Sequence, residues 1–319
     1  MISFVKGFTL LLIIFCAQTL FAQIDTSEVI RLQKQWVNSQ NPASDKELHQ
    51  TFLEYNSNEI AILLKKAKEF QNDSIFSVKW NNLLLVSILA KNSIENNNKS
   101  EIGSFLLKSL FDTDTRIRYL AYESLMILEN YNFSQNQKDT TLLALKQETN
   151  NEIISGLYKL CAEQNIIDAQ SYLKEIASSD STPFYQKWVA LSSLVRMGDS
   201  EAEETMYYYL SKIGLSLDVI NTLYPLVVFS KSKQNVDYLI SIIKNDNSEC
   251  ESMNPNYTQT IPCAYYVLKK VAPHIDAINW YSPNGLEKLD YIKAIEEAKK
   301  IFNKSNFIWN FKEEQQYRE

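Results

Sequence analysis

The sequence predicts an all-α protein, an α-solenoid of about five or six stacked antiparallel helix pairs. Glycine and proline are scarce, with 6 and 7 in 319 residues. Apolar residues recur with helical spacing in nearly every window from Thr51 onward. One pattern of small and large apolar residues also recurs along the chain, which is typical of stacked helical repeats.

Residues 1–22 have the features of a secretory signal peptide. Lys6 gives a positive start, and an apolar core follows over residues 8–16, with an expected cleavage before Gln23. The apolar run is interrupted at Gln18 and is shorter than the roughly 20 residues that span a bilayer. We therefore expect an exported protein, periplasmic or secreted, with no integral membrane segment after the signal is removed.

The mature chain is predicted to begin with an N-terminal helical cap over residues 23–74, whose pattern does not align with the repeats. The first helix pair, "SIFSVKWNNLLLVSILAK" and "SEIGSFLLKSLF", opens a repeat region over residues 75–300. Residues 301–319 are interpreted as a C-terminal tail.

The next first helix is predicted in "DTDTRIRYLAYESLMIL", residues 112–128. Ile117, Ala121 and Leu125 belong to one continuous apolar face. Asp112 and Asp114 precede it, and we interpret them as capping residues rather than as a catalytic carboxylate pair, because their oxygens accept from free helix N–H groups.

The pattern recurs in "KWVALSSLVRMGD", where Ala190 matches Ala121 at a spacing of about two helix pairs. Gly156 takes the same position in the intervening unit, and Thr222 and Ala264 take it in the next two. The second helices that follow read "TTLLALKQET", "IIDAQSYLKEIAS", "EAEETMYYYLSK", "QNVDYLISIIK" and "LEKLDYIKAIEEAKKIF".

The motifs "DTDTRIRYLAYESLMIL" and "KWVALSSLVRMGD" resemble the HEAT-repeat family and, more loosely, its short bacterial HEAT-like variety. The resemblance covers roughly residues 75–300. It implies a curved right-handed solenoid whose second helices line an inner, partner-binding surface. It specifies a fold and not a function.

Three cysteines follow the expected signal: Cys161, Cys250 and Cys263. The last two bracket "SECESMNPNYTQTIPC", which is polar, contains two prolines and is typical of a loop. In an oxidising compartment we expect them to form a disulfide, which closes the loop and stabilises the fold by roughly 3 kcal/mol. The alternative is two unpaired thiols. Cys161 lies among apolar residues and is expected to be buried.

The sequence offers little for catalysis. His49 and His274 are far apart, and no zinc-binding, nucleophile-elbow or phosphate-loop motif occurs. The net charge of −6, without a lysine-arginine stripe, argues against nucleic acid or an anionic membrane as partner. We expect no catalytic residue, metal or cofactor, and a protein as partner; the oligomeric state stays open.

Aromatic residues are abundant, with 18 Tyr, 15 Phe and 5 Trp. The three tyrosines at 207–209 cannot share one helical face, because adjacent residues are about 100° apart. Aligning the second helices places Leu173, Tyr207 and Leu239 in one buried row. A second predicted row contains Ile176, Leu210 and Ile242.

This alignment leaves Tyr208 and Tyr209 off the buried row, level with Lys174 and Glu175 and close to Glu204. We interpret these five residues as a candidate partner-binding surface, because tyrosine offers contact area with a polar tip. The alternative is packing between neighbouring repeats. The segment "INWYSPNG", residues 278–285, is a second exposed-aromatic candidate.

The resulting hypothesis is an exported HEAT-like scaffold that mediates protein-protein interaction in the cell envelope without catalysis. One alternative is a module that binds a peptide or a glycan through aromatic residues in the concave groove. Another is an enzyme of lyase type on a HEAT-like fold, which the lack of a placed nucleophile disfavours.

Overall fold

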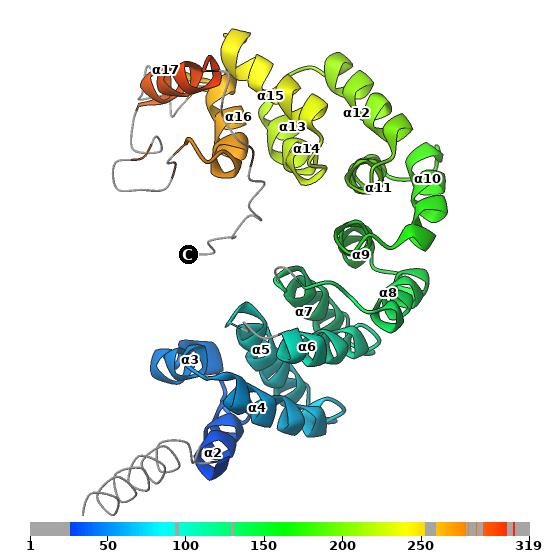
Figure 1. The fold of residues 1–319 in the computed structure, drawn as a ribbon, viewed down its shortest axis with the longest axis vertical. Helices are drawn as coiled ribbons and strands as arrows, with labels where there is room; N and C mark the ends of the chain where they lie inside the picture. The colour runs from blue at the N-terminus through cyan, green and yellow to red at the C-terminus, as the bar shows by residue number, and fades with distance from the viewer. Residues whose placement is uncertain are drawn as a thin grey trace, which may run out of the picture. The chain divides into compact units, whose positions relative to one another are not determined.

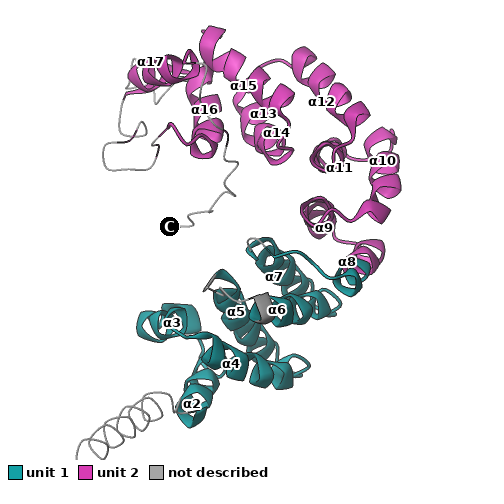
Figure 2. Cartoon of the chain, in the orientation of Figure 1, with its two compact units in different colours: residues 1–140 teal, residues 141–319 magenta. Residues whose placement is uncertain are grey.

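The computed structural model describes residues 26–92, 96–128, 131–252, 260–278, 280, 285, 290–304 and 309. The expected signal peptide, most of the expected tail and most of the segment 278–285 lie outside these residues. The chain divides into two compact units, residues 1–140 and 141–319 (Figure 2), with the boundary inside helix α8 (Gln135–Gln147).

Unit 1 is a cluster of helices around α5 (Figure 1). Its elements are α2 (Thr26–Val37), the 3-10 helix η1 (Pro42–Ser44), α3 (Lys46–Leu53), α4 (Ser57–Phe70), α5 (Phe76–Asn92), α6 (Asn96–Ser109) and α7 (Thr115–Met126). Helix α5 packs against α2, α3, α4, α6 and α7. The described part of the predicted cap over residues 23–74 contains α2, η1, α3 and α4, joined by short turns.

The start of α7 confirms the capping interpretation for Asp114, whereas Asp112 holds the preceding turn. The Asp114 carboxylate accepts a hydrogen bond from the backbone N–H of Arg116. Asp112 accepts from the Asp114 N–H at 2.8 Å and pairs with Lys79 of α5 at 2.7 Å. Ile117 and the other small and apolar residues of the predicted face are buried, except that Leu120 is half-buried.

Unit 2 continues the pattern of helix pairs and confirms the all-α fold class. Its helices are α9 (Asn151–Glu163), α10 (Gln170–Ser178), α11 (Phe184–Arg196), α12 (Ser200–Lys212), α13 (Leu217–Thr222), α14 (Tyr224–Phe229), α15 (Lys233–Asn245), α16 (Cys263–Val271) and α17 (Tyr291–Phe302). It also contains the 3-10 helices η2 (Ile167–Ala169) and η3 (Ala272–His274) and a two-stranded hairpin, β1 (Glu249–Ser252) and β2 (Thr260–Pro262).

Helix α11 lies at the centre of unit 2. It packs against α9, α10, α12 and α14, and every residue from 188 to 195 is buried. Ala190, Ser192 and Ser193 allow close approach of the neighbouring helices because their side chains are short.

The first helices of unit 2 end in one recurring turn. Among the described residues, positive φ occurs at Asn165 (46°), Gly198 (86°) and Lys231 (54°). Gly198 follows Asn165 at the same interval at which Lys231 follows Gly198. Each backbone N–H donates to the carbonyl three residues earlier, and a left-handed residue in this place is a common helix C-cap. The turns therefore define a constant repeat length in this part of the chain.

Arg196 joins three first helices with the same period. Its Nη1 donates to the Phe229 carbonyl at 2.8 Å, and its Nη2 pairs with Glu163, each of them 33 residues away. The guanidinium also lies 4.7 Å from the centroid of the Phe229 ring. Because the Arg196 side chain is only 9% exposed, the bridge between α9, α11 and α14 is largely shielded from water.

The repeat length corrects one predicted core row. Tyr207 is 39% exposed, whereas Met206 is fully buried. Met206 lies one repeat length after Leu173 and one repeat length before Leu239, so it occupies the row that we predicted for Tyr207. In the second predicted row Leu210 and Ile242 are buried and Ile176 is half-buried.

The assignment of Thr222 to the repeated small position is also wrong. Thr222 is exposed and ends α13, while Leu223 and Leu226 are buried. Pro225 lies in the first turn of α14 and cannot donate a backbone hydrogen bond, which divides this first helix in two.

Within unit 2 the first and second helices lie on the opposite sides from those that the HEAT-repeat resemblance implies. Figure 1 shows α9, α11 and α14 on the inner side of its curve and the second helices α10, α12 and α15 on the outer side. The short side chains of α9 and α11, such as Gly156 and Ser193, suit the inner side, because helices approach more closely there.

Replacing Arg196 tests the bridge. Arg196→Ala leaves the Glu163 carboxylate largely buried without its cation, so we expect the free energy of unfolding to fall by about 3–5 kcal/mol. Arg31→Ala, which removes an exposed i,i+3 pair with Glu28, should cost far less, because water screens that pair. Urea denaturation followed by circular dichroism measures both, and equal costs would contradict the bridge.

Candidate functional site

Helix α12 carries the candidate surface because one of its faces is anchored. Ala202, Met206 and Leu210 are buried and hold the helix against its neighbours α11 and α15. Tyr208 and Tyr209 are 58% and 50% exposed, as the sequence predicted. A run of three tyrosines on a helix with one buried face necessarily presents side chains in several directions.

The three tyrosine rings have different neighbours. Tyr207 packs edge-on against Tyr238 of α15, with centroids 6.1 Å apart. Tyr209 contacts the buried Trp188 of α11 at 6.3 Å and Tyr208 at 5.8 Å. Tyr208 is the most exposed of the three, whereas the rings of Tyr207 and Tyr209 pack on neighbouring helices, as the alternative interpretation expects.

The sequence interpretation missed Phe184, which extends this row of rings. Phe184 begins α11, is 59% exposed and lies 6.2 Å from Trp188 by ring centroids. The row therefore runs Phe184, Trp188, Tyr209, Tyr208 across two helices. The sequence contained a signal for this exposed ring. Two aromatic residues directly follow Pro183 at a predicted helix start, where few residues are expected to be buried.

Lys174 ties the neighbouring second helix α10 to the start of α12. Its Nζ lies 2.7 Å from the Asp199 carboxylate, which also caps α12 by accepting from the Ala202 N–H at 2.9 Å. The hydrogen bond to Asp199 raises the pKa of Lys174. Burial alone would raise the pKa of Asp199, but Lys174 and the backbone donors outweigh it and lower that pKa.

The two carboxylates of the predicted surface face solvent. Glu175 on α10 and Glu204 on α12 are exposed, and neither forms an ion pair within the described part of the chain. Glu204 stands four residues before Tyr208, so the two share one exposed face of α12. The structure thus brings Glu204, Tyr208 and Tyr209 together on one helix and places Lys174 and Glu175 on the next.

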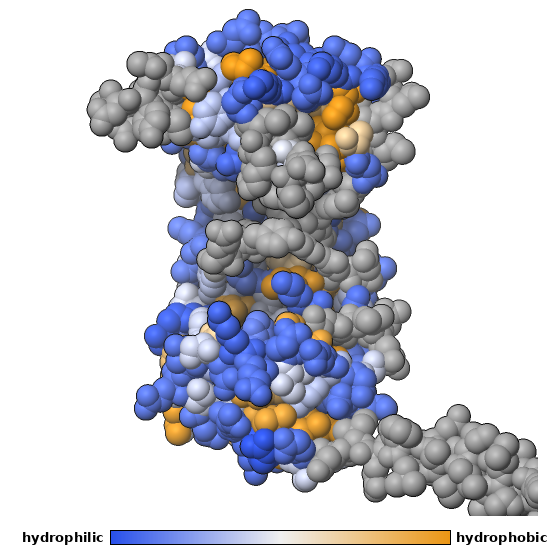
Figure 3. Space-filling view, turned by 90° about the vertical axis from the view of Figure 1, so that its left-hand side faces the viewer, coloured by the Kyte–Doolittle hydropathy of each residue, from blue (hydrophilic) through white to orange (hydrophobic). Residues whose placement is uncertain are grey.

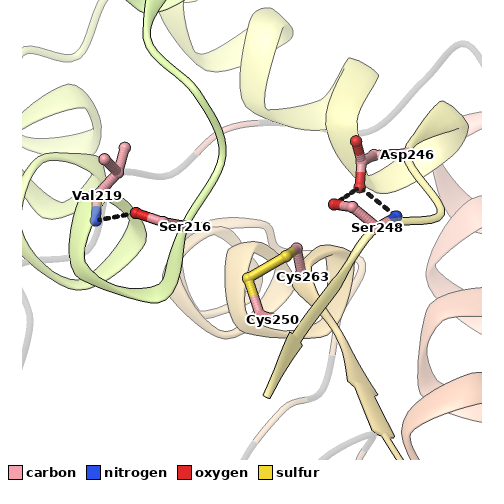
Figure 4. Close-up of a disulfide and its surroundings, with 6 residues drawn as sticks. All are labelled: Ser216, Val219, Asp246, Ser248, Cys250 and Cys263. Atoms are coloured by element: carbon pink, nitrogen blue, oxygen red, sulfur yellow. Dashed lines mark hydrogen bonds between the residues drawn. A yellow bond between two sulfur atoms is a disulfide. The ribbon is translucent and has the colours of Figure 1, made fainter. Parts of the chain in front are cut away.

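Cys250 and Cys263 lie at disulfide distance, with their sulfur atoms 2.06 Å apart (Figure 4). The loop predicted around them contains the antiparallel hairpin β1–β2. The register is irregular between Glu249 and Glu251, so Cys250 is the extra residue of a bulge and its side chain reaches the first residue of α16.

The third cysteine, Cys161, is expected to be unreactive. Cys161 is fully buried in α9, and burial raises the pKa of its thiol to about 12. Since the thiolate is the reactive form, this residue packs as a small apolar side chain, as predicted.

The described residues outside the candidate surface offer no cluster of metal-binding side chains. Across the described ranges no group of three or more His, Cys, Asp or Glu residues has metal-binding geometry. His49 lies beside Trp36, with ring centroids 6.3 Å apart. His274 is buried at the end of η3.

On the face shown in Figure 3, apolar residues form patches between hydrophilic ones. None of the helices in the described ranges has the length and apolar character needed to cross a bilayer. No protein-family model matches this chain, and no curated protein matches it either.

The Asp199 pair predicts a pH-dependent contribution to stability. Asp199→Asn keeps a capping oxygen and removes the ion pair, whereas Asp199→Ala removes both and should cost about 0.5–2 kcal/mol. Because the folded-state pKa of Asp199 is lowered, the advantage of wild type over Asp199→Asn should be complete above about pH 4. It should disappear as the pH falls through the folded-state pKa.

Urea unfolding at pH 7, 4 and 2.5 measures this difference. A difference that does not change with pH would show that the ion pair contributes nothing.

Proposed function

We propose that this chain is an exported HEAT-like scaffold that binds another protein through the exposed tyrosines and acids of α12, without catalysis. The observation that carries the proposal is the row of rings from Phe184 to Tyr208. Three of its members are about half exposed or more, although the helices that carry them, α11 and α12, are anchored by buried residues.

Exposed aromatic residues on a rigid frame suit protein recognition. Tyrosine buries a large area on binding and loses little conformational entropy, because it has only two side-chain torsions. The frame keeps the rings in place, since α12 is fixed by its buried face and by the Asp199 link to Lys174. Binding then orders few additional groups, which favours affinity.

Two further observations support export and a binding role. Disulfides persist in oxidising compartments, and Cys250 and Cys263 lie at disulfide distance. The exposed residues of α12 include aromatic rings, carboxylates and Lys212, a set that suits binding to a protein surface better than nucleophilic catalysis.

Site-directed cross-linking tests the proposed function. A photoreactive phenylalanine analogue is introduced at position 208, and a matched variant carries it at position 111, whose phenylalanine is also exposed but belongs to unit 1. Both variants are produced in the native host and irradiated in intact cells. We expect one abundant protein adduct at position 208 and none of that size at position 111.

Circular dichroism of both purified variants controls for folding. The proposal fails if position 208 yields no protein adduct, or if both positions yield the same set.

A further inference from the structure

The acids and rings of α12 define the chemistry of a partner. Glu201, Glu204 and Tyr208 lie at i, i+3 and i+7, which places them along one exposed face of the helix. We call these three residues the α12 stripe. Its two carboxylates form no ion pair within the described ranges, and two neighbouring cations have contacts of their own.

Those cations are Lys174, which pairs with Asp199, and Lys212, whose Nζ lies 5.8 Å from the Tyr208 ring centroid. The contact with Lys212 shows that the Tyr208 ring accepts a cation on its face. The same chain places guanidinium groups over rings twice more, Arg116 over Phe76 at 3.9 Å and Arg196 over Phe229 at 4.7 Å. Rings and carboxylates together therefore form an electronegative surface.

Arginine fits this surface better than lysine. Its planar guanidinium stacks on an aromatic ring and donates two parallel hydrogen bonds to a carboxylate, while an ammonium does only one of these well. Glu204 stands one turn before Tyr208, so one guanidinium reaches both groups.

The spacing of residues along the α12 stripe leaves room for a second arginine at Glu201. The helix rises by about 10 Å between Glu201 and Tyr208. A polyproline II segment returns to the same face every third residue, and three of its residues span about 9 Å. A segment in this extended conformation with arginines three residues apart thus presents both side chains to one face, and places one at Tyr208 and Glu204 and the other at Glu201.

We propose that the α12 stripe binds an extended, arginine-containing segment of the partner protein, an inference that rests on the proposed function and names the partner's chemistry. One guanidinium stacks on Tyr208 and pairs with Glu204, and the second pairs with Glu201. Binding is electrostatic in part and weakens as salt screens the carboxylates.

Fluorescence anisotropy tests this with the full mature chain and a labelled Ser/Gly peptide that carries two arginines three residues apart. Matched peptides carry glutamate or lysine in their place. We expect binding in the order arginine, lysine, glutamate, with weaker arginine binding at high salt. Tyr208→Ala and Glu204→Gln should each weaken binding about tenfold, whereas Tyr208→Phe retains it because the ring face is kept.

Glu47→Gln is the matched control, since it removes the same charge from an exposed helix position in unit 1. The inference is overturned if the arginine peptide does not bind, if the glutamate peptide binds equally, or if Glu47→Gln weakens binding as much as Glu204→Gln. Failure here with a specific adduct at position 208 removes the arginine partner and leaves the scaffold proposal. Failure of both experiments removes both.

Discussion

The guanidinium of Arg196 holds three successive first helices of unit 2 together through a carboxylate, a backbone carbonyl and an aromatic ring. A charge placed this deep is favourable only while each of its donors has a partner, so the helices must keep their register. The left-handed turn at Gly198 follows two residues later, and Asp199 then caps α12. The orientation of the exposed tyrosines therefore depends on the end of α11.

The two layers of unit 2 differ in how much of their surface they bury. The inner first helices include short side chains among their buried residues, and in α11 every residue from 188 to 195 is buried. The outer second helices bury one face each and leave the other free, as in α12. Because a stacked repeat buries its first helix on several sides, a recognition surface is easier to place on the second helix.

Much of this organisation could be predicted from the sequence. Helical spacing located the helices, and the position of Asp114 before an apolar face identified its capping role, because both signals are local. The exposure of Tyr208 and Tyr209 also followed from helix geometry, and so did the burial of Cys161.

The errors at Tyr207 and Thr222 both come from the repeat length. The alignment of Ala121 with Ala190, which belong to different units, implies too long a repeat for unit 2, and the step from Ala190 to Thr222 is one residue too short. The true repeat length is set by turns at Asn165, Gly198 and Lys231, and only one of these is glycine, so the turns share no residue type.

The consequences of that error are specific. A shift of one position exchanged Tyr207 for Met206 in the predicted core row. The Arg196 bridge was missed for a related reason, since its partners Glu163 and Phe229 share no chemistry that a repeat pattern would reveal.

Hydrogen-deuterium exchange of the mature chain tests most directly whether α11 is the centre on which unit 2 is built. Amides from residues 188 to 195 should exchange most slowly in the unit, and those of α13 much faster, because that short helix ends at the break before α14. Exchange of α11 as fast as that of α13 would contradict the central role of this helix and of the bridge at its end.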